Sequence, residues 1–176
     1  DQQGNWVSGQ GATVGFADIK DTARVNNMLR KVKGIFPRDL KLFWSVKPSP
    51  QRPDVLELVA IKVTSRDGGP ALGGDAIVDA SQDYSQTGQP NVNISMNSEG
   101  ARVWKRITGE NVGRQIAIVL DGYVYSHPTV QGEIPTGRTE ISGGAMSIEE
   151  AQDLANILKA GKLPAPARIV EEAVVG

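Results

Sequence analysis

The sequence lacks cysteine altogether and contains a single histidine, His127. Without cysteine there can be no disulfide and no thiolate chemistry, and thiol usage gives no information on the redox compartment. Zinc sites need clustered Cys or His, and no stretch has the spaced carboxylates of a calcium loop. No serine lies in a G-x-S-x-G elbow. We therefore predict no metal, no cofactor and no enzymatic activity.

Strong net charge, abundant aromatic residues and long apolar runs are also missing. The formal net charge is −1, the isoelectric point is about 5.9, and aromatics make up 5% of the 176 residues. A chain without a basic field is a poor partner for nucleic acid. The longest apolar runs, such as residues 116–120, fall far short of the roughly 20 residues that span a bilayer. The first residues lack a signal-peptide pattern, so we expect an excised domain of a longer protein.

The most informative stretch that is present is MSIEEAQDLANILKAGKLPAPARIVEE, which begins at Met146. Ser147 and Glu150 have the spacing of a capping box, and apolar residues recur behind them at helical intervals. Gly161 fits a left-handed position after the last turn, and Pro164 and Pro166 prevent the helix from continuing. The pattern predicts a helix that ends near residue 160, followed by an extended segment over residues 167–175.

The N-terminal part has the pattern of one helix and a hairpin. Asp18 or Asp21 can cap a helix that ends at Gly34, and residues 40–46 and 55–64 read as strands. Alternation puts Trp44 on one face of its strand, and we expect an aromatic here to be covered by a segment outside this chain. Residues 65–75 (SRDGGPALGGD) then hold four glycines and one proline, so we place a subdomain boundary there.

Further strands and a helix follow the boundary. The pattern predicts strands at residues 76–81, 91–96, 115–120, 123–125 and 139–141, and a helix at residues 98–108. Asp121-Gly122 is a hairpin turn signal between two of the strands. The two helices match weakly at a shift of 50 residues, which indicates two ferredoxin-like strand–helix–strand halves. The predicted fold class is α+β, a two-layer sandwich with a mainly antiparallel sheet and helices on one face.

Two blocks carry a resemblance to a known family. The first is LANILKAGKLPAPARIVEEAVVG at the C-terminal end, and the second is MNSEGARVWKRITGENVGRQIAIVLDGYVYSHP, residues 96–128. They resemble the first large extracytoplasmic loop of SecD, or of the fused SecDF chain, which are membrane subunits of the protein-export machinery. The resemblance is specific from about residue 72 onward and general over residues 1–71.

The resemblance implies an inner-membrane parent protein with this segment on the periplasmic side. It implies a partial base subdomain at residues 1–70, a head subdomain at residues 71–163 and a return strand at residues 164–176. The implied partners are unfolded preprotein and, through the parent, SecF and the SecYEG translocon. In the family the loop moves with the proton gradient and engages the emerging preprotein. The proton-conducting residues lie in membrane helices, so no proton-relay site is carried over to this chain.

A head that swings needs compliant joints, and glycine and proline concentrate at both junctions of the predicted head. The hinge candidates on entry and exit are Gly68, Gly69, Gly73, Gly161, Pro164 and Pro166.

Two alternatives stay open at this point. One is a secreted ligand-binding or hydrolytic α+β domain in which Asp79, Asp83, Glu133 and His127 converge in a pocket. An enzyme pocket should gather carboxylates of perturbed pKa in one cleft, whereas a translocation module should show few buried acids and an open edge or groove. The other is a scaffold that only docks folded membrane subunits. Preprotein, if bound, could be held by sheet-edge addition or by a shallow apolar cleft.

Overall fold

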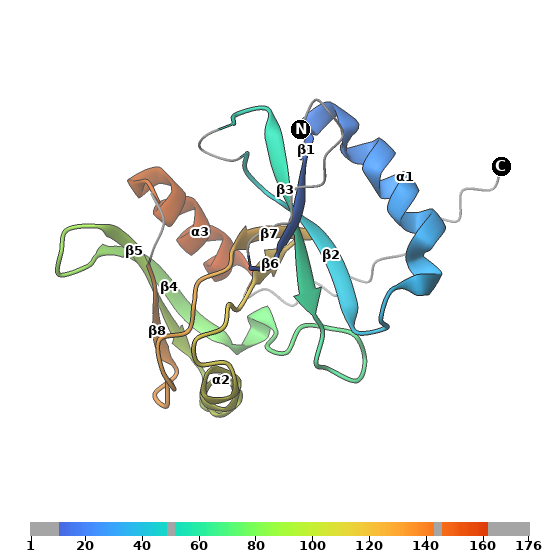
Figure 1. The fold of residues 1–176 in the computed structure, drawn as a ribbon. Coiled ribbons are helices and arrows are strands. Elements are labelled where there is room, and N and C mark those ends of the chain that lie inside the picture. Colours follow the sequence, from blue (N-terminus) through green and yellow to red (C-terminus); the bar gives the residue numbers. More distant parts are fainter. Residues whose placement is uncertain (1–10, 49–51, 143–145, 162–176) are drawn as a thin grey trace. The chain divides into compact units, whose positions relative to one another are not determined.

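A computed structural model describes residues 11–48, 52–142 and 146–161 (Figure 1). The chain divides into two compact units. Unit 1 consists of Asp1–Ala71 and Arg106–Glu133, and unit 2 of Leu72–Lys105 and Ile134–Gly176. The chain therefore passes between the units after Ala71, after Lys105 and after Glu133. The second passage falls inside the helix α2, Ser98–Glu110.

Unit 1 is built on a five-stranded sheet in the order β1-β3-β2-β7-β6. Its strands are β1 (Thr13–Asp18), β2 (Leu40–Ser45), β3 (Val55–Lys62), β6 (Ile118–Leu120) and β7 (Tyr123–Ser126). The helix α1 (Thr22–Val32) lies between the 3-10 turns η1 (Ile19–Asp21) and η2 (Lys33–Ile35). Every strand pair is antiparallel except β2 with β7, which is parallel. A parallel pair needs a long connection, and here that connection runs through unit 2.

Buried residues of unit 1 lie on both faces of this sheet, because the consecutive β3 residues Leu58 and Val59 are both buried. Val59 and Val124 are 1% and 3% exposed. Trp44 is also buried, and its indole N–H donates to Asn26 Oδ1 on α1 at 2.8 Å. This chain therefore covers Trp44 itself. Phe43, on the other face of the strand, is half-buried, and its cover by an outside segment stays a prediction.

The turn and cap predictions in unit 1 have different outcomes. Asp121 and Gly122 both have positive φ, 50° and 78°, as a type I′ turn between β6 and β7 requires. Asp21 is the residue before α1, but neither it nor Asp18 makes a side-chain cap hydrogen bond. The Thr22 hydroxyl instead donates to the Ile19 carbonyl at 2.8 Å. The hairpin is confirmed, and the aspartate cap is wrong because the 3-10 turn leads directly into the helix.

Unit 2 has a three-stranded antiparallel sheet in the order β4-β5-β8, and the helix α3 packs on it. The elements are η3 (Gly74–Ala76), β4 (Ile77–Tyr84), β5 (Pro90–Met96), β8 (Arg138–Ile141) and α3 (Ile148–Ala160). The core joins small and branched side chains of the helix and sheet, namely Ala80, Val92, Ile94, Ile141, Ala151, Leu154, Ala155 and Leu158. Figure 1 shows α3 lying along β4 and β5. Helix on an antiparallel sheet is the predicted α+β arrangement.

The start of α2 packs closely within unit 2 because the contacting residues are small. Asn97 Oδ1 accepts the Gly100 N–H at 2.8 Å, and Asn97 N–H donates to the Ala76 carbonyl at 2.9 Å. A Cβ added at Gly100 would lie 2.7 Å from the Cβ of Ala76. A Cβ at Gly137, whose φ is +68°, would lie 2.5 Å from the Cβ of Ala101. Both glycines are there because backbone and neighbouring methyl groups approach too closely for a side chain.

The helix α3 begins as predicted and ends differently. Ser147 Oγ accepts the Glu150 N–H, and Glu150 Oε2 accepts the Ser147 N–H, so the capping box is confirmed. Gly161 has φ −61° and ψ −9°, a right-handed conformation, so the predicted left-handed cap is wrong. Its N–H still continues the helical ladder to the Ile157 carbonyl at 2.8 Å. Pro164, Pro166 and the predicted strand at residues 167–175 lie outside the described residues.

The division into units differs from the division expected from sequence over one segment. Residues 106–133 belong to unit 1, whereas the sequence placed them in the head at residues 71–163. The reason is the pairing of β7 with β2, in which Trp44 and Ser45 lie opposite Tyr123 and Val124. A contact between residues about 80 positions apart leaves no local signal in the sequence.

Candidate functional site

The glycine-rich connection between β3 and η3 begins with a closed turn over residues 65–69. The Gly68 N–H donates to the Ser65 carbonyl at 3.3 Å, and the Ser65 hydroxyl donates to the Gly69 carbonyl at 2.5 Å. The Gly69 N–H donates to Asp67 Oδ1 at 3.1 Å, and the Lys41 ammonium donates to the Gly68 carbonyl. The first part of the predicted hinge is therefore an ordered, hydrogen-bonded turn.

Asp67 is the acid whose pKa this turn changes. Its pKa is lowered from 3.8, chiefly by the Gly69 N–H, which donates to the carboxylate and stabilises its charged form. The side chain is exposed, so this shift marks a local turn and not a buried reactive acid.

The hinge candidates differ in what their backbone requires. Gly68 has φ +74° and needs the freedom of glycine. Gly69 and Gly161 have no positive φ, and an added Cβ would meet its neighbours only at 3.4 Å or more. A Cβ at Gly73 would lie 2.4 Å from Asp75 Oδ1, the end of a side chain that can move. The geometry thus fixes the shape of the connection, and hinge motion stays a prediction.

The four residues of the hydrolytic alternative have partners of their own in the two units. In unit 2, Asp79 Oδ1 lies 3.2 Å from Lys159 Nζ, and Asp83 Oδ2 accepts from Asn93 Nδ2 at 2.8 Å. In unit 1, His127 Nε2 lies 3.6 Å from Glu57 Oε1. The two aspartates and the histidine therefore each contact a polar side chain within their own unit.

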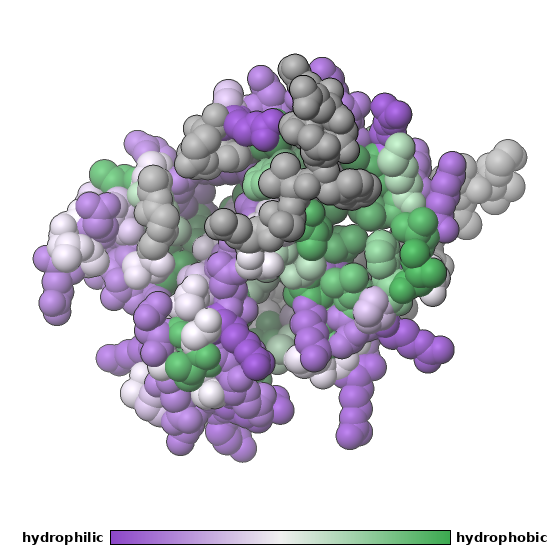
Figure 2. All heavy atoms as spheres, in the orientation of Figure 1, coloured by the Kyte–Doolittle hydropathy of each residue, from purple (hydrophilic) through white to green (hydrophobic). Residues whose placement is uncertain are grey.

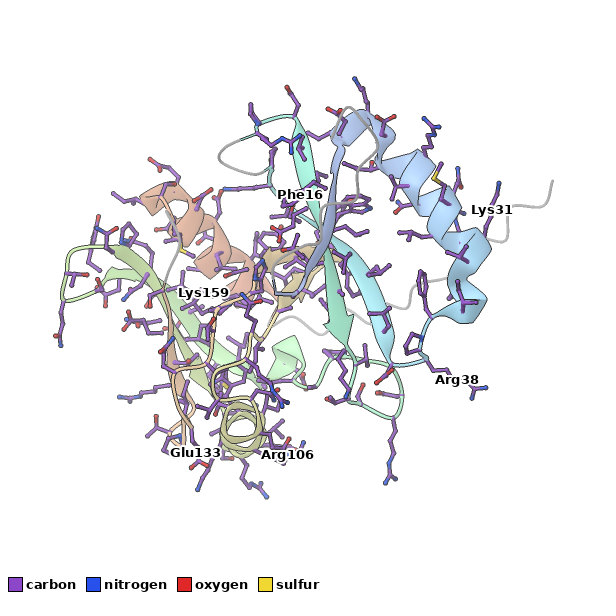
Figure 3. All side chains as sticks on the ribbon, viewed as in Figure 1. Phe16, Lys31, Arg38, Arg106, Glu133 and Lys159 are labelled. Atoms are coloured by element: carbon purple, nitrogen blue, oxygen red, sulfur yellow. The ribbon has the colours of Figure 1, made fainter. Side chains whose placement is uncertain are left out.

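Metal ligation has no support within the described ranges. No group of three or more His, Cys, Asp or Glu side chains there could hold a metal ion. Glu133, the remaining candidate, belongs to unit 1 and lies 3.0 Å from the Cβ position of Gly109 (Figure 3).

Exposed apolar side chains gather on unit 1, which the sequence pattern did not reveal. Figure 2 shows apolar surface over the region of α1 and its neighbouring strands. Phe16 is 53% exposed and Ile35 is 79% exposed. The other large apolar residues of this set that are at least two-fifths exposed are Val14, Ile19, Met28 and Val32. The α1 sequence is amphipathic, but no residue of the helix is fully buried. Periodicity predicts an apolar face, and the extent of its cover depends on tertiary neighbours.

Strand edges are the second open feature. Among the described strands, β1 and β6 end the sheet of unit 1, and β4 and β8 end the sheet of unit 2. An edge strand presents unpaired backbone N–H and C=O groups, to which an extended chain of any sequence can add.

Comparison with known proteins decides the family. The family described as SecDF, P1 head subdomain, matches residues 59–165. The protein translocase subunit SecD of Rhodothermus marinus is 42% identical over 173 residues, which cover 96% of this chain and 27% of that protein. The chain belongs to the SecD/SecDF family. The SecDF subunit of Thermus thermophilus is 38% identical over 109 residues, covering 62% of this chain and 15% of its own length.

A solved structure of the family is similar as well. It is described as a membrane component SecDF that enhances protein export, is 32% identical, and has a TM-score of 0.49. The match covers 91% of this chain and 62% of that one. This chain spans about a quarter of the length of the SecD from Rhodothermus marinus. SecD and SecDF are translocase subunits, and among the described residues of this chain no helix is long and apolar enough to cross a membrane.

The SecD/SecDF blocks now have structural places. The NSEGA sequence forms the start of α2, where the Asn97 side chain caps the helix and Gly100 allows close packing on Ala76. The IVLDGYVYS sequence forms the β6–β7 hairpin of unit 1. LANILKA forms the C-terminal half of α3, in which Leu154, Ala155 and Leu158 are buried. Each block is explained by packing or turn geometry, and none gathers reactive groups.

Proposed function

We propose that this chain is the periplasmic part of a SecD or SecDF translocase subunit that engages unfolded preprotein as it emerges. The observation that carries the proposal is the open edges of the two sheets. Backbone N–H and C=O groups are common to every client, so an edge can hold chains of unrelated sequence. The match to the family described as SecDF, P1 head subdomain, supports it.

The remaining partners come through the longer parent protein. SecF and the SecYEG translocon would meet the parent at the membrane, and the proton gradient would act on the parent's membrane helices. The part proposed for this chain is to bind the client and move, so that the client does not slide back. The hydrolytic alternative has weaker support, because its aspartates and histidine have local partners.

The exposed apolar surface of unit 1 supports a second, structural role in the parent. Apolar side chains such as Phe16 and Ile35 are costly to leave in water, at roughly 25 cal/mol per Å². We infer that this surface packs against a further segment of the parent, in line with a base subdomain that residues 1–70 form only in part.

Photo-crosslinking in the full-length parent tests client engagement. A photoreactive residue placed in turn at exposed positions of β4 and α1, such as Ser81 and Arg24, should crosslink to a preprotein arrested during export. The yield should change when an uncoupler removes the proton gradient. If no position on either unit yields a client adduct while export proceeds normally, preprotein engagement by this domain is wrong.

The hinge proposal is tested by substitutions that the fold accommodates. Gly69→Val and Gly161→Val place side chains where the backbone has no positive φ, so each unit should stay folded. We expect export by the full-length parent to slow, with an unchanged thermal midpoint of the isolated chain. Gly34→Val, at a glycine with open space around it, is the matched control outside both junctions. Export at the control rate in both variants would contradict the proposed joints.

A further inference from the structure

The outer edge of β4 is the longest unpaired strand edge in the described part of the chain. β4 has 8 residues, against 6 in β1, 4 in β8 and 3 in β6. β4 pairs with β5 on one side, and no described strand pairs with β4 on its other side. A chain that adds to unit 2 by backbone hydrogen bonds has most room here.

The hydrogen-bond register shows which β4 residues face outward. In an antiparallel pair, alternate residues direct both N–H and C=O to the partner strand, and those between direct them away. The Ser85 N–H donates to the Gln89 carbonyl at 2.8 Å, and Ser81 and Asp83 share its parity. On the far side of β5, the Met96 N–H donates to the Gly137 carbonyl, in agreement with this register. Ala80, Gln82 and Tyr84 therefore direct their backbone groups away from β5.

Side chains make contacts at both ends of this edge, whereas the backbone groups at its centre are open. At one end Lys159 reaches from α3 to Asp79, with both side chains more than half exposed (Figure 3). At the other end Asp83 Oδ1 accepts the outward N–H of Tyr84 at 2.8 Å. Between them, the outward groups of Ala80 and Gln82 have no hydrogen bond to another described residue. The open stretch provides two donors and two acceptors.

The side chains beside the open stretch fit an extended chain that carries apolar and basic residues. Val78 is 44% exposed and Tyr84 is 53% exposed, so apolar surface flanks the stretch at both ends. The carboxylates of Asp79 and Asp83 lie along the same strand. Because Asp79 already faces Lys159, Asp83 is the carboxylate that favours a basic residue in the occupant. A second copy pairing through β4 would bring these carboxylates to a shared edge, which disfavours self-association.

We infer that the outer edge of β4, centred on Gln82, binds an extended polypeptide segment as an added strand. The inference rests on the proposed function and names the surface that engages the client. Because only two residues offer free backbone groups, binding is weak and tolerant of sequence. Weak binding of this kind suits a client that must dissociate and bind again as it passes.

Gln82→Pro is the variant that isolates the edge. Proline removes the outward N–H of Gln82 and leaves the β4–β5 ladder intact, because that N–H takes no part in it. Gln82→Ala changes the side chain and keeps the N–H, and is the matched control. Hydrogen exchange of β5 and α3 amides reports whether each variant keeps the fold of unit 2.

The probe is a fluorescent heptapeptide of alternating threonine and valine with a lysine at each end, titrated into the 176-residue chain. We expect Gln82→Pro to weaken binding about five- to tenfold, the worth of one hydrogen bond, and Gln82→Ala to leave it within about twofold. The same peptide with N-methylated central amides should lose binding to the native chain. Binding should also slow exchange of the Gln82 amide. If Gln82→Pro fails to fold, the N-methylated peptide and the exchange measurement still test the inference, because both use the native chain.

Three results would overturn the inference. Equal binding of the native and N-methylated peptides means that side chains elsewhere hold the client, and leaves the proposed function standing. A dimer of the native chain that Gln82→Pro abolishes would assign the edge to self-association. Absence of peptide binding by the native chain at millimolar concentration would refute the edge and also count against client engagement by this domain alone.

Discussion

Replacing Gly100 by alanine should destabilise unit 2, although alanine is the better helix former. The added Cβ would lie 2.7 Å from the Cβ of Ala76, while carbon atoms in contact prefer 3.5–4.0 Å. Relieving about 1 Å of overlap between backbone-anchored groups costs roughly 1–3 kcal/mol. The gain in helix propensity returns about 0.8–1 kcal/mol. The net prediction is a loss of up to about 2 kcal/mol in the free energy of unfolding.

A double-mutant cycle with Ala76→Gly makes this reasoning decisive. Ala76→Gly alone removes a buried methyl group and should cost about 1 kcal/mol. In that background the obstructing Cβ is gone, so Gly100→Ala should become stabilising by up to about 1 kcal/mol. The predicted coupling energy between the two sites is near 2 kcal/mol. It is large enough that Gly100→Ala changes from destabilising to stabilising when position 76 is glycine.

Urea unfolding, monitored through hydrogen exchange of β5 amides, measures the stability of unit 2 in the native chain, the two single variants and the double variant. Gly109→Ala is the control in the same helix, because its Cβ would meet only the end of the flexible Glu133 side chain, at 3.0 Å. It should be neutral or stabilising by up to about 1 kcal/mol. The close-packing account fails if Gly100→Ala has the same effect with alanine and with glycine at position 76.

Gly137→Ala combines a positive φ of +68° with a Cβ only 2.5 Å from that of Ala101, and should lower the unfolding free energy by about 2 kcal/mol or more in a urea titration. Gly161→Ala should instead stabilise the chain by about 0.5–1 kcal/mol, because the backbone at Gly161 is right-handed. A loss of stability would indicate that Gly161 adopts the left-handed conformation after all. Ser147→Ala removes the capping box and should cost about 1 kcal/mol, with Ser147→Asp as a conservative control that retains the cap. The lowered pKa of Asp67 means that its contribution is present above the unfolded-state pKa and is lost as pH falls through the folded value. The urea midpoints of the native chain and Asp67→Asn should therefore converge below about pH 4; a difference that persists at lower pH would contradict the turn geometry.

Local signals predicted the elements well where neighbours in sequence are also neighbours in space. The capping box joins residues three apart, and the Asp121-Gly122 turn joins adjacent residues, so both were correct. The grouping of Asp79, Asp83, Glu133 and His127 depended on distant contacts, and the structure divides these residues between the two units.

The sequence alone determined the fold class, the helices and the hairpin, because periodicity, caps and turn residues act over a few positions. The family followed from the resemblance of two sequence blocks, which the comparisons bear out. Only the tertiary structure decided that residues 106–133 return to the sheet of unit 1 and that Gly100 must lack a side chain. It also decided which β4 amides face outward, since that depends on the register of the β4–β5 pair. These features depend on contacts between segments far apart in the chain, and the energy of such contacts is set by the assembled neighbours and not by the local residues.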